Sequence, residues 1–194
     1  MLFLLGVAVL SASCAHKFPD YQPIGHRLPV SQKSVSVEIA NPGYVFKVDK
    51  IGTPVMDFDY GTKPNLAEYV RSSLVDEFKV AGFMPVSSND AEIRLEVTIR
   101  NIVKAEKLHF FFPYLYLGGG GAFVVDLDVS VGLRGGDRLF LRKFASVKTK
   151  SWHLIFIVPI FPNYRKVELS AFQDVCSEIV RETAALVGVR GGGQ

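Results

Sequence analysis

Three long segments in which apolar and polar residues alternate constrain this 194-residue chain more than any other feature. The first two are Ile93 to Ile99 and Phe123 to Val131. The third, Arg138 to Lys150, follows a Gly-Gly-Asp turn and slips in its alternation near Arg142-Lys143, which predicts a β-bulge there. A strand with one apolar and one polar face needs a single covering layer. These segments therefore predict one sheet that is covered on one side.

Two amphipathic segments are suited to form the covering layer. The first opens at Pro64-Asn65, has Glu68 at the spacing of a capping box, and stops at Gly82. The second runs from about Lys166 to Val187. Shorter strands are expected at Val35–Ile39, at Phe83–Val86 and, as a less regular segment, at Tyr44–Val48. The predicted fold is α+β, a two-layer sandwich in which an antiparallel sheet of four to five strands carries two helices on one face.

The composition is that of a globular protein and argues against nucleic acid as a partner. Apolar residues make up 48% of the chain and charged residues 21%, which is far from a disordered composition. The net charge is +3, and lysines and arginines are spread along the chain without long runs. We therefore expect one folded domain over residues 34–188 and no nucleic-acid partner.

The N-terminus indicates export and a lipid anchor. Met1 to Leu10 is apolar but too short to span a bilayer, as in the core of a signal peptide. Ser11-Ala12-Ser13-Cys14 follows at once and resembles the lipobox of bacterial lipoproteins. The resemblance implies a leader over residues 1–13, diacylglycerol on the Cys14 sulfur and an acyl group on the new N-terminus. The alternative is an N-terminal hydrophobic segment that is buried in a core.

The residues after Cys14 predict where the domain sits. Residues 14–33 are polar and contain three prolines, so we expect an extended tether that follows the lipidated residue. By resemblance to lipoproteins of Gram-negative bacteria, Ala15 points to the outer membrane, with the domain facing the periplasm. Residues 189–194 are glycine-rich and are expected to be a flexible tail. The covalent lipid on Cys14 is the only attached group that we expect, with no cofactor and no metal.

A family resemblance supports the same location. The order of strands and helices, the helix end Ala81-Gly82-Phe83, the acidic turn Ser88 to Ala91 and the lipobox are similar to YajG-type lipoproteins, and the layout is also similar to LptE-type lipoproteins. The resemblance covers roughly residues 35 to 187. It implies an envelope lipoprotein of α+β fold, and it assigns no biochemical activity.

Two aromatic segments stand out from the alternating strands. The first is His109 to Leu117, which runs into Gly118–Gly121, and the second is Trp152 to Pro162. The directions of the predicted strands bring both segments to the same end of the sheet. Exposed there, they would form a large apolar surface. The residues that we expect to contact a partner or lipid are Phe110, Phe111, Phe112, Tyr114, Tyr116, Trp152, Ile155 and Phe156.

The predicted function is therefore binding without catalysis. In the leading hypothesis the aromatic segments dock an envelope protein partner or a second copy of the chain. One alternative is that both segments fold back and extend the core, and another is a lipid or lipopolysaccharide-binding accessory module. Transmembrane β-hairpins are disfavoured because these segments lack the alternation of a barrel strand.

The residues with chemical potential do not form a recognisable catalytic site. Gly118–Gly121 is not a phosphate loop, since no Gly-Lys-Ser/Thr follows, and is interpreted as a flexible stretch. Asp126 and Asp128 share a strand face but have no third acidic partner nearby for a metal. His109 and His153 are expected near each other without a carboxylate to complete a site. Cys176 lies on the apolar face of the last helix and is interpreted as a buried thiol.

Overall fold

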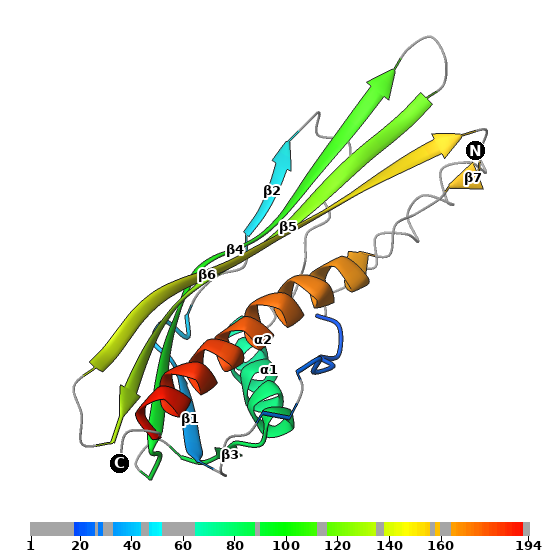
Figure 1. Ribbon diagram of the computed structural model, residues 1–194. Coiled ribbons are helices and arrows are strands. Elements are labelled where there is room, and N and C mark those ends of the chain that lie inside the picture. The colour runs from blue at the N-terminus through cyan, green and yellow to red at the C-terminus, as the bar shows by residue number, and fades with distance from the viewer. Residues whose placement is uncertain are drawn as a thin grey trace.

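The computed structural model describes residues 18–25, 27–28, 33–43, 47–51, 65–87, 90–111, 116–134, 138–155, 158–159 and 164–191. The leader, Cys14 and the end of the tail lie outside these residues. The elements in chain order are β1 (Ser34–Ile39), β2 (Lys47–Ile51), α1 (Leu66–Ala81), β3 (Met84–Pro85), β4 (Ile93–Phe111), β5 (Tyr116–Leu133), β6 (Arg138–Ile155), β7 (Val158–Pro159) and α2 (Tyr164–Gly191). Both helices lie on the same side of one sheet (Figure 1).

The sheet is mixed, with strand order β3-β1-β4-β5-β6-β7 and β2 paired with a further part of β4. β4, β5 and β6 are antiparallel to one another, whereas β1 is parallel to β3 and β4, and β2 is parallel to β4. The predicted two-layer α+β architecture is confirmed. The expectation of a purely antiparallel sheet is wrong for β1, β2 and β3, because α1 separates β1 and β2 from β3 and β4, and a helical connection returns the chain in the same direction.

The central strands are much longer than the alternating segments that predicted them. β4 continues to Phe111, β5 begins at Tyr116, and β6 continues to Ile155. β6 pairs with β5 in unbroken register from Phe140 to Leu154. The aromatic and glycine-rich residues at these strand ends therefore extend the sheet instead of interrupting it.

Two bulges interrupt the register, and neither is at the predicted position. One is at Arg100 in β4, and the other leaves Leu139 as an extra residue beside the β5–β6 turn. The bulge expected at Arg142-Lys143 is absent, since both residues pair in regular register with β5. The alternation slips there because Arg142 and Lys143 are exposed at the border of the buried face, and no residue is inserted.

Helix α1 has the boundaries that its end signals predict. The Asn65 side chain accepts a hydrogen bond from the Glu68 backbone N–H at 3.2 Å, which satisfies one free donor of the first turn. Gly82 ends the helix in the left-handed conformation with φ of 100°, which favours glycine. The apolar residues of α1 face the sheet, and its buried apolar positions are Leu66, Ala67, Val70, Leu74, Phe78 and Ala81.

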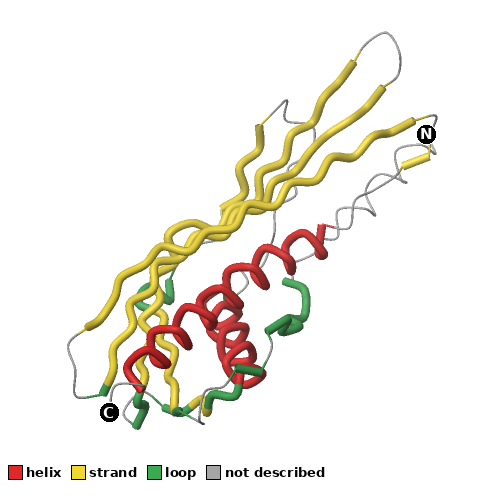
Figure 2. The backbone as a smooth tube through the Cα atoms, in the orientation of Figure 1, coloured by secondary structure: helices red, strands yellow, loops and turns green. Residues whose placement is uncertain are grey.

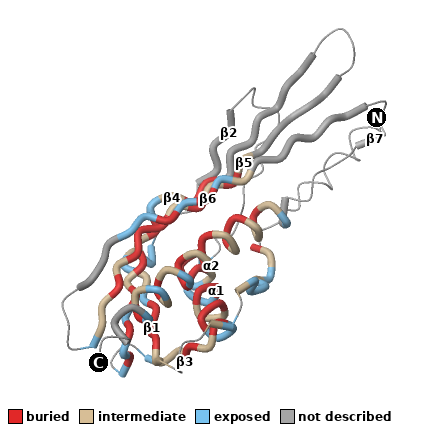
Figure 3. The backbone as a smooth tube through the Cα atoms, viewed as in Figure 1, coloured by how far each residue is buried: buried red, intermediate tan, exposed pale blue. Residues whose placement is uncertain are grey.

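The hydrophobic core lies between the helices and one half of the sheet (Figure 3). Alternate residues of β4 and β5 are buried on the helix side, as the two-residue pattern predicted. Full burial of one such side chain contributes about 1.5–3 kcal/mol. The largest apolar residues that are fully buried are Leu66, Leu74, Phe78, Ile93, Leu95, Ile99, Ile102, Phe123, Leu127, Phe172 and Ile179.

The sheet extends beyond the helical layer, as Figures 1 and 2 show. We call residues 93–103 of β4, 122–133 of β5 and 142–148 of β6, which contribute the buried side chains of these strands, the covered half. The projecting half comprises residues 104–111, 116–121 and 149–155 of the same strands together with β2. Neither α1 nor α2 lies over the projecting half (Figure 1). In the part of the chain that the structure describes, neither helix is long and apolar enough to cross a membrane.

Candidate docking end of the sheet

Backbone pairing brings the two aromatic segments together. Phe111 of β4 lies opposite Tyr116 of β5, and Leu117 of β5 lies opposite both Phe110 of β4 and Leu154 of β6. β7 pairs with β6 at this same end. We call residues 108–111, 116–118 and 152–155 the aromatic end of the sheet. Segments that are distant in sequence therefore form one continuous piece of sheet at the tip of the projecting half.

The structure places part of the predicted contact set. Phe110 and Phe111 lie in β4, Tyr116 lies in β5, and Trp152 and Ile155 lie in β6. The other three predicted contact residues, Phe112, Tyr114 and Phe156, lie outside the described residues. Exposure of the whole set stays a prediction.

The sequence of the aromatic end is suited to a sheet that is covered on both faces. Consecutive residues of a strand belong to opposite faces. Runs such as Phe110-Phe111 and Leu154-Ile155 therefore supply apolar residues to both faces. A sheet of that kind needs a cover on each side, and neither α1 nor α2 provides one (Figure 1). This mismatch between composition and cover makes the aromatic end the candidate docking site.

The glycine run has a different role from the one expected. The composition of Gly118–Gly121 predicts a flexible stretch, but all four residues lie in β5 and pair with β4 on one side and β6 on the other. Pairing on both sides satisfies the backbone donors and acceptors that would otherwise need water. Gly118 pairs with both His109 and His153. The run therefore forms the middle of the projecting half, between the two histidine-bearing strands.

The N-terminal segment after Cys14 packs against the helices. Phe18 is buried, stacks on Tyr69 of α1 with ring centroids 4.8 Å apart, and meets Phe172 of α2 edge-on at 5.7 Å. The Tyr69 hydroxyl donates a hydrogen bond to the Pro19 carbonyl at 2.9 Å. A single aromatic cluster thus joins the segment to both helices.

Glu77 of α1 binds the same segment through hydrogen bonds to residues 21–25. Its carboxylate is fully buried and accepts hydrogen bonds from the Tyr21 hydroxyl at 2.7 Å, the Ile24 N–H at 2.8 Å and the Gly25 N–H at 2.9 Å. A β-carbon on Gly25 would lie only 2.6 Å from the carboxylate oxygen, so a larger residue would displace the Glu77 side chain from this position. We call residues 18–25, with their contacts to α1 and α2, the clamp.

The clamp corrects the expectation of a free tether over residues 14–33. The prolines and polar residues predicted an extended chain in solvent, whereas residues 18–25 lie against the helical layer and Leu28 donates a backbone hydrogen bond to Ala81 at 3.0 Å. The prediction was wrong for these residues because an extended segment has no periodicity, and its partners come from distant parts of the chain. The segment next to the anchor is therefore part of the folded domain.

Beneath the clamp, the Cys176 thiol and the Tyr21 hydroxyl lie beside the Glu77 carboxylate. Cys176 of α2 is fully buried, as predicted, and burial raises the pKa of its thiol far above the ordinary value. Burial likewise raises the pKa of Tyr21, and the nearby Cys176 and the hydrogen bond to Glu77 act in the same direction. A thiol that stays protonated and buried is a poor nucleophile and metal ligand. The cluster is suited to holding the clamp and unsuited to chemistry.

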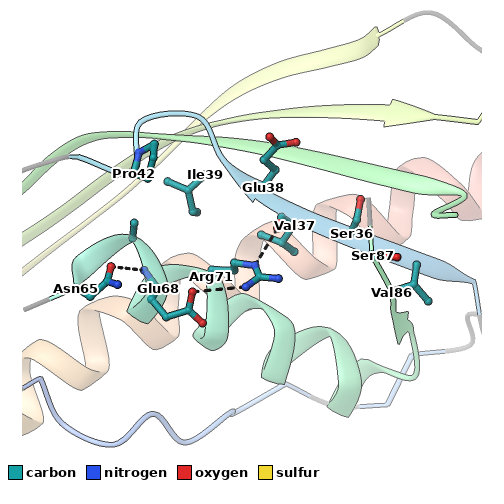
Figure 4. Close-up of a pocket in the computed structure, with 11 residues that line it drawn as sticks. Ser36, Val37, Glu38, Ile39, Pro42, Asn65, Glu68, Arg71, Val86 and Ser87 are labelled. Carbon is teal, nitrogen blue, oxygen red and sulfur yellow. Dashed lines mark hydrogen bonds and ion pairs between the residues drawn. The ribbon is translucent and has the colours of Figure 1, made fainter. Parts of the chain in front are cut away.

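A groove lies between β1 and the start of α1 (Figure 4). It measures about 490 Å³ and is lined on the helix side by Asn65, Glu68 and Arg71. The outer edge of β1 is extended by β3 only at its beginning. Beyond that point the Arg71 Nε donates to the Val37 carbonyl at 3.4 Å, while an Arg71 guanidinium nitrogen lies 3.5 Å from Glu68. A charged side chain thus occupies the sheet edge where another strand could otherwise pair.

The acidic pair on β5 is neutralised by basic residues of the neighbouring strands. Asp126 forms an ion pair with Lys143 of β6 at 2.9 Å, and Asp128 pairs with Arg100 of β4. Among the residues that the structure describes there is no group of three potential metal ligands. The Asp126 and Asp128 carboxylates therefore act as cross-strand partners.

Sequence reasoning missed Tyr21 and Glu77, although one signal was present. Glu77 occurs at a position of the α1 stripe, three residues after Leu74 and seven after Val70. An acidic residue among buried positions indicates a partner that satisfies it. No local pattern identifies Tyr21, because its contact with Glu77 joins residues 56 positions apart.

Comparison with solved structures finds a bacterial protein of similar fold and weaker likenesses to others. Protein XCC0632 from Xanthomonas campestris, of family DUF330, has a TM-score of 0.52 at 12% identity, covering 91% of this chain and 97% of its own. A minor lipoprotein from Acinetobacter baumannii has a TM-score of 0.44 at 10% identity, covering 80% and 95%. A neuraminyllactose-binding hemagglutinin homolog from Helicobacter pylori has a TM-score of 0.45 at 12% identity, covering 84% and 91%.

At these identities the likeness to the Xanthomonas protein shows a shared fold and nothing more. No protein-family model matches the sequence, and a search of curated proteins finds no match. The function must therefore be argued from the residues and their arrangement in this chain.

Proposed function

We propose that this chain is a bacterial envelope lipoprotein, acylated at Cys14, that acts by binding and docks through the aromatic end of its sheet. The observation that carries the proposal is the pairing of Leu117 with both Phe110 and Leu154. This register gathers two apolar segments into one piece of sheet beyond the helices. If the side chains of these segments are exposed, as predicted, they form a large apolar surface, which is a feature of interaction sites.

The lipobox and Ala15 support a location at the outer membrane, on its periplasmic side, by resemblance to sorting in Gram-negative lipoproteins. The docking partner in this proposal is a component of the envelope, which can be a protein, a second copy of the chain or lipid. Catalysis has no support among the described residues, since the acidic pair on β5 is used in ion pairs and Cys176 is enclosed. Binding without catalysis is therefore the function that we propose.

The alternative of a carrier with an acyl-chain cavity is not favoured by the described hollows. The groove beside β1 is lined partly by charged residues. A second hollow, of about 530 Å³ between α1, α2 and β6, includes Glu77, Asp174 and Glu178 in its wall. A cavity for an acyl chain is expected to be mostly apolar. Both hollows instead place charged side chains in their walls, which an acyl chain would leave buried without water.

The first test concerns the anchor. The mature wild type is expected to carry the mass of its acyl groups and to fractionate with outer membranes, whereas Cys14→Ser is expected to accumulate as an unacylated precursor or soluble protein. Intact mass and membrane flotation check both. Identical behaviour of the two proteins would refute the lipoprotein part of the proposal.

The second test concerns docking. The triple change Phe111→Ser, Trp152→Ser and Ile155→Ser is expected to reduce crosslinked partner several-fold while the circular dichroism spectrum is unchanged. Val147→Ser is the matched control, because Val147 is an apolar residue of β6 that is 60% exposed in the covered half. Unfolding of the triple variant would show that the aromatic end belongs to a core, and unchanged crosslinking would exclude it as the docking site.

A further inference from the structure

The distance between the lipid anchor and the folded domain is short. Cys14 precedes Phe18 by four residues, and four residues span at most about 14 Å when fully extended. Phe18 is held by ring contacts with Tyr69 and Phe172, and the clamp continues to Gly25. An acylated Cys14 therefore fixes a definite region of the domain next to the bilayer.

That region borders the projecting half of the sheet. Phe172, which contacts Phe18, also contacts Phe123 of β5 with ring centroids 5.7 Å apart. Phe123 lies at the end of the covered half, and Leu117 of the aromatic end is six residues farther along the same strand, about 20 Å away. The N-terminal segment accordingly lies beside the first half of α2, where the sheet leaves the helical layer (Figure 1). Phe18, the described residue nearest to Cys14 in the sequence, thus lies at the end of the covered half that borders the projecting half.

The strands between the clamp and the aromatic end are rich in lysine. In the projecting half and at its border they contain two acidic residues, Asp49 and Glu106, and a larger set of basic ones: Lys47, Lys50, Lys104, Lys107, Lys148 and Lys150. Lys148 also forms an ion pair with Asp174 of α2. Register joins the three longer strands at this level, since Phe123 pairs with both Lys104 and Lys148. The excess of positive charge is complementary to anionic lipid headgroups.

The order of residues along the strands is that of a membrane interface. A band of lysines is followed by a tip that contains tryptophan, tyrosine and phenylalanine, and such residues favour the boundary between headgroups and acyl chains. A protein partner would explain the apolar tip, but it would leave the lysine band and the short anchor as separate features. A lipid bilayer accounts for all three.

We propose that the aromatic end of the sheet enters the interface of the same bilayer that holds the Cys14 lipid, and that the clamp orients the domain for this contact. The inference rests on the proposed function, in particular on acylation of Cys14, and names the partner of the docking end as the bilayer. The lipid anchor supplies attachment, and the clamp together with the aromatic end supplies orientation.

The chain carries its own probe, because Trp152 is its single tryptophan and lies in the aromatic end. Full-length acylated protein is reconstituted in vesicles of phosphatidylethanolamine and phosphatidylglycerol with or without brominated acyl chains. The fluorescence of Trp152 is expected to fall roughly twofold or more in the brominated vesicles, since the indole lies at the headgroup boundary. Fluorescence that is the same in both vesicles would overturn the inference.

The matched control moves the tryptophan along the same strand. The double variant Trp152→Phe and Val147→Trp keeps one tryptophan in β6 but places it five residues back, about 17 Å from the original position. It is expected to show little quenching. Equal quenching at both positions would contradict a contact made by the aromatic end, since the covered half would then lie equally deep.

The orientation by the clamp has its own test. A flexible Gly-Ser insertion of about twenty residues between Lys17 and Phe18 lengthens the link and leaves Cys14 and the aromatic end intact. Quenching of Trp152 is expected to fall several-fold while flotation with membranes is unchanged. Unchanged quenching would refute the orienting role of the clamp.

The failures of the inference and of the proposed function are distinguishable. If Trp152 is not quenched but a photo-crosslinker at Tyr116 joins the chain to another protein, the inference fails and docking to a protein stands. If Cys14→Ser fractionates as the wild type does, the lipoprotein proposal fails, and the inference fails with it.

Discussion

The two halves of the same three strands differ in their cover. In the covered half, alternate residues of β4 and β5 are apolar and buried by α1 and α2. In the projecting half the strands keep their pairing, but apolar residues follow one another directly in the sequence and neither helix lies above them (Figure 1). The comparison shows that strands pair in both halves, whereas the two helices bury side chains only in the covered half. The covered half is stabilised within the chain, and the projecting half is expected to gain its cover from outside.

The largest expected difference is in the response to loss of an aromatic side chain. Phe172→Ala removes a fully buried ring that contacts Phe18, Tyr69 and Phe123, and we expect the free energy of unfolding to fall by about 3–5 kcal/mol. Trp152→Ser in the projecting half is expected to cost less than about 1 kcal/mol, as for a surface change. Urea unfolding of both delipidated variants measures the difference. Equal losses would break the distinction between the halves.

The hydrogen bonds of Glu77 in the clamp are expected to contribute to stability at the border of the two halves. Glu77→Ala leaves the Tyr21 hydroxyl and two backbone N–H groups without their acceptor, and we expect a loss of about 3 kcal/mol. Trypsin should then cut after Lys17 or Arg27 faster than in the wild type, because the segment is released. Glu68→Ala in the same helix is the control, since the Glu68 side chain is exposed. Equal protection of all three proteins from trypsin would contradict the role of Glu77.

The stability of the domain is expected to depend on pH, because the Cys176 thiol and the Tyr21 hydroxyl are weak acids that become buried on folding. Burial raises the folded-state pKa of Cys176 above its ordinary value of 9.0, so the folded protein keeps a proton that the unfolded chain releases. The stabilisation is fully present below about pH 9 and is lost as the pH rises. Titration of the thiol in the unfolded chain should make the free energy of unfolding at about pH 10.5 lower by about 2 kcal/mol than at about pH 7. Tyr21 adds to the same trend, because burial raises its pKa as well.

Urea unfolding of the wild type and of Cys176→Ala at both pH values checks this dependence. The variant is expected to lose less stability between about pH 7 and about pH 10.5. A parallel decline of the two proteins would assign the alkaline sensitivity to other groups.

The smallest expected effect compares two glycines. Gly25→Ala brings a β-carbon to 2.6 Å from a Glu77 oxygen, so the carboxylate must move and a loss of about 1–2 kcal/mol is expected. Gly188→Ala has open space around the new carbon and lies in α2, where alanine is the better helix former, so a gain of about 0.5–1 kcal/mol is expected. Thermal unfolding measures both, and changes of the same sign would contradict this account of the clamp.

Local patterns were sufficient to predict much of the fold. The alternation around Ile93 and Phe123 identified the covered strands, and Asn65 and Gly82 marked the ends of α1. The burial of Cys176 followed from its place on the apolar face of α2. These features were predictable because each depends on the period of one element or on a cap formed within a few residues.

Other features could not be predicted, because they depend on pairing between distant residues. Gly118–Gly121 has the composition of a flexible stretch, and only the strands on both sides of it make it part of a sheet. The parallel direction of β1 and β2 also depends on which strand each one meets. The candidate docking end was predicted as a set of residues, and the register then placed Phe110 and Leu154 on the two sides of Leu117.

The sequence by itself determined the two-layer class, the ends of α1 and the presence of two aromatic segments, since periodicity and composition are written along the chain. Helix α2 extends beyond the predicted Lys166 to Val187 at both ends, from Tyr164 to Gly191, so residues 189–191 belong to the helix and not to a flexible tail. Only the tertiary structure decided that residues 18–25 form a clamp instead of a tether. A buried carboxylate such as Glu77 must be satisfied by whichever donors the fold brings to it, and here they come from a segment more than fifty residues away. That long-range choice places Phe18, four residues after Cys14 in the sequence, against Phe172 at the border of the projecting half.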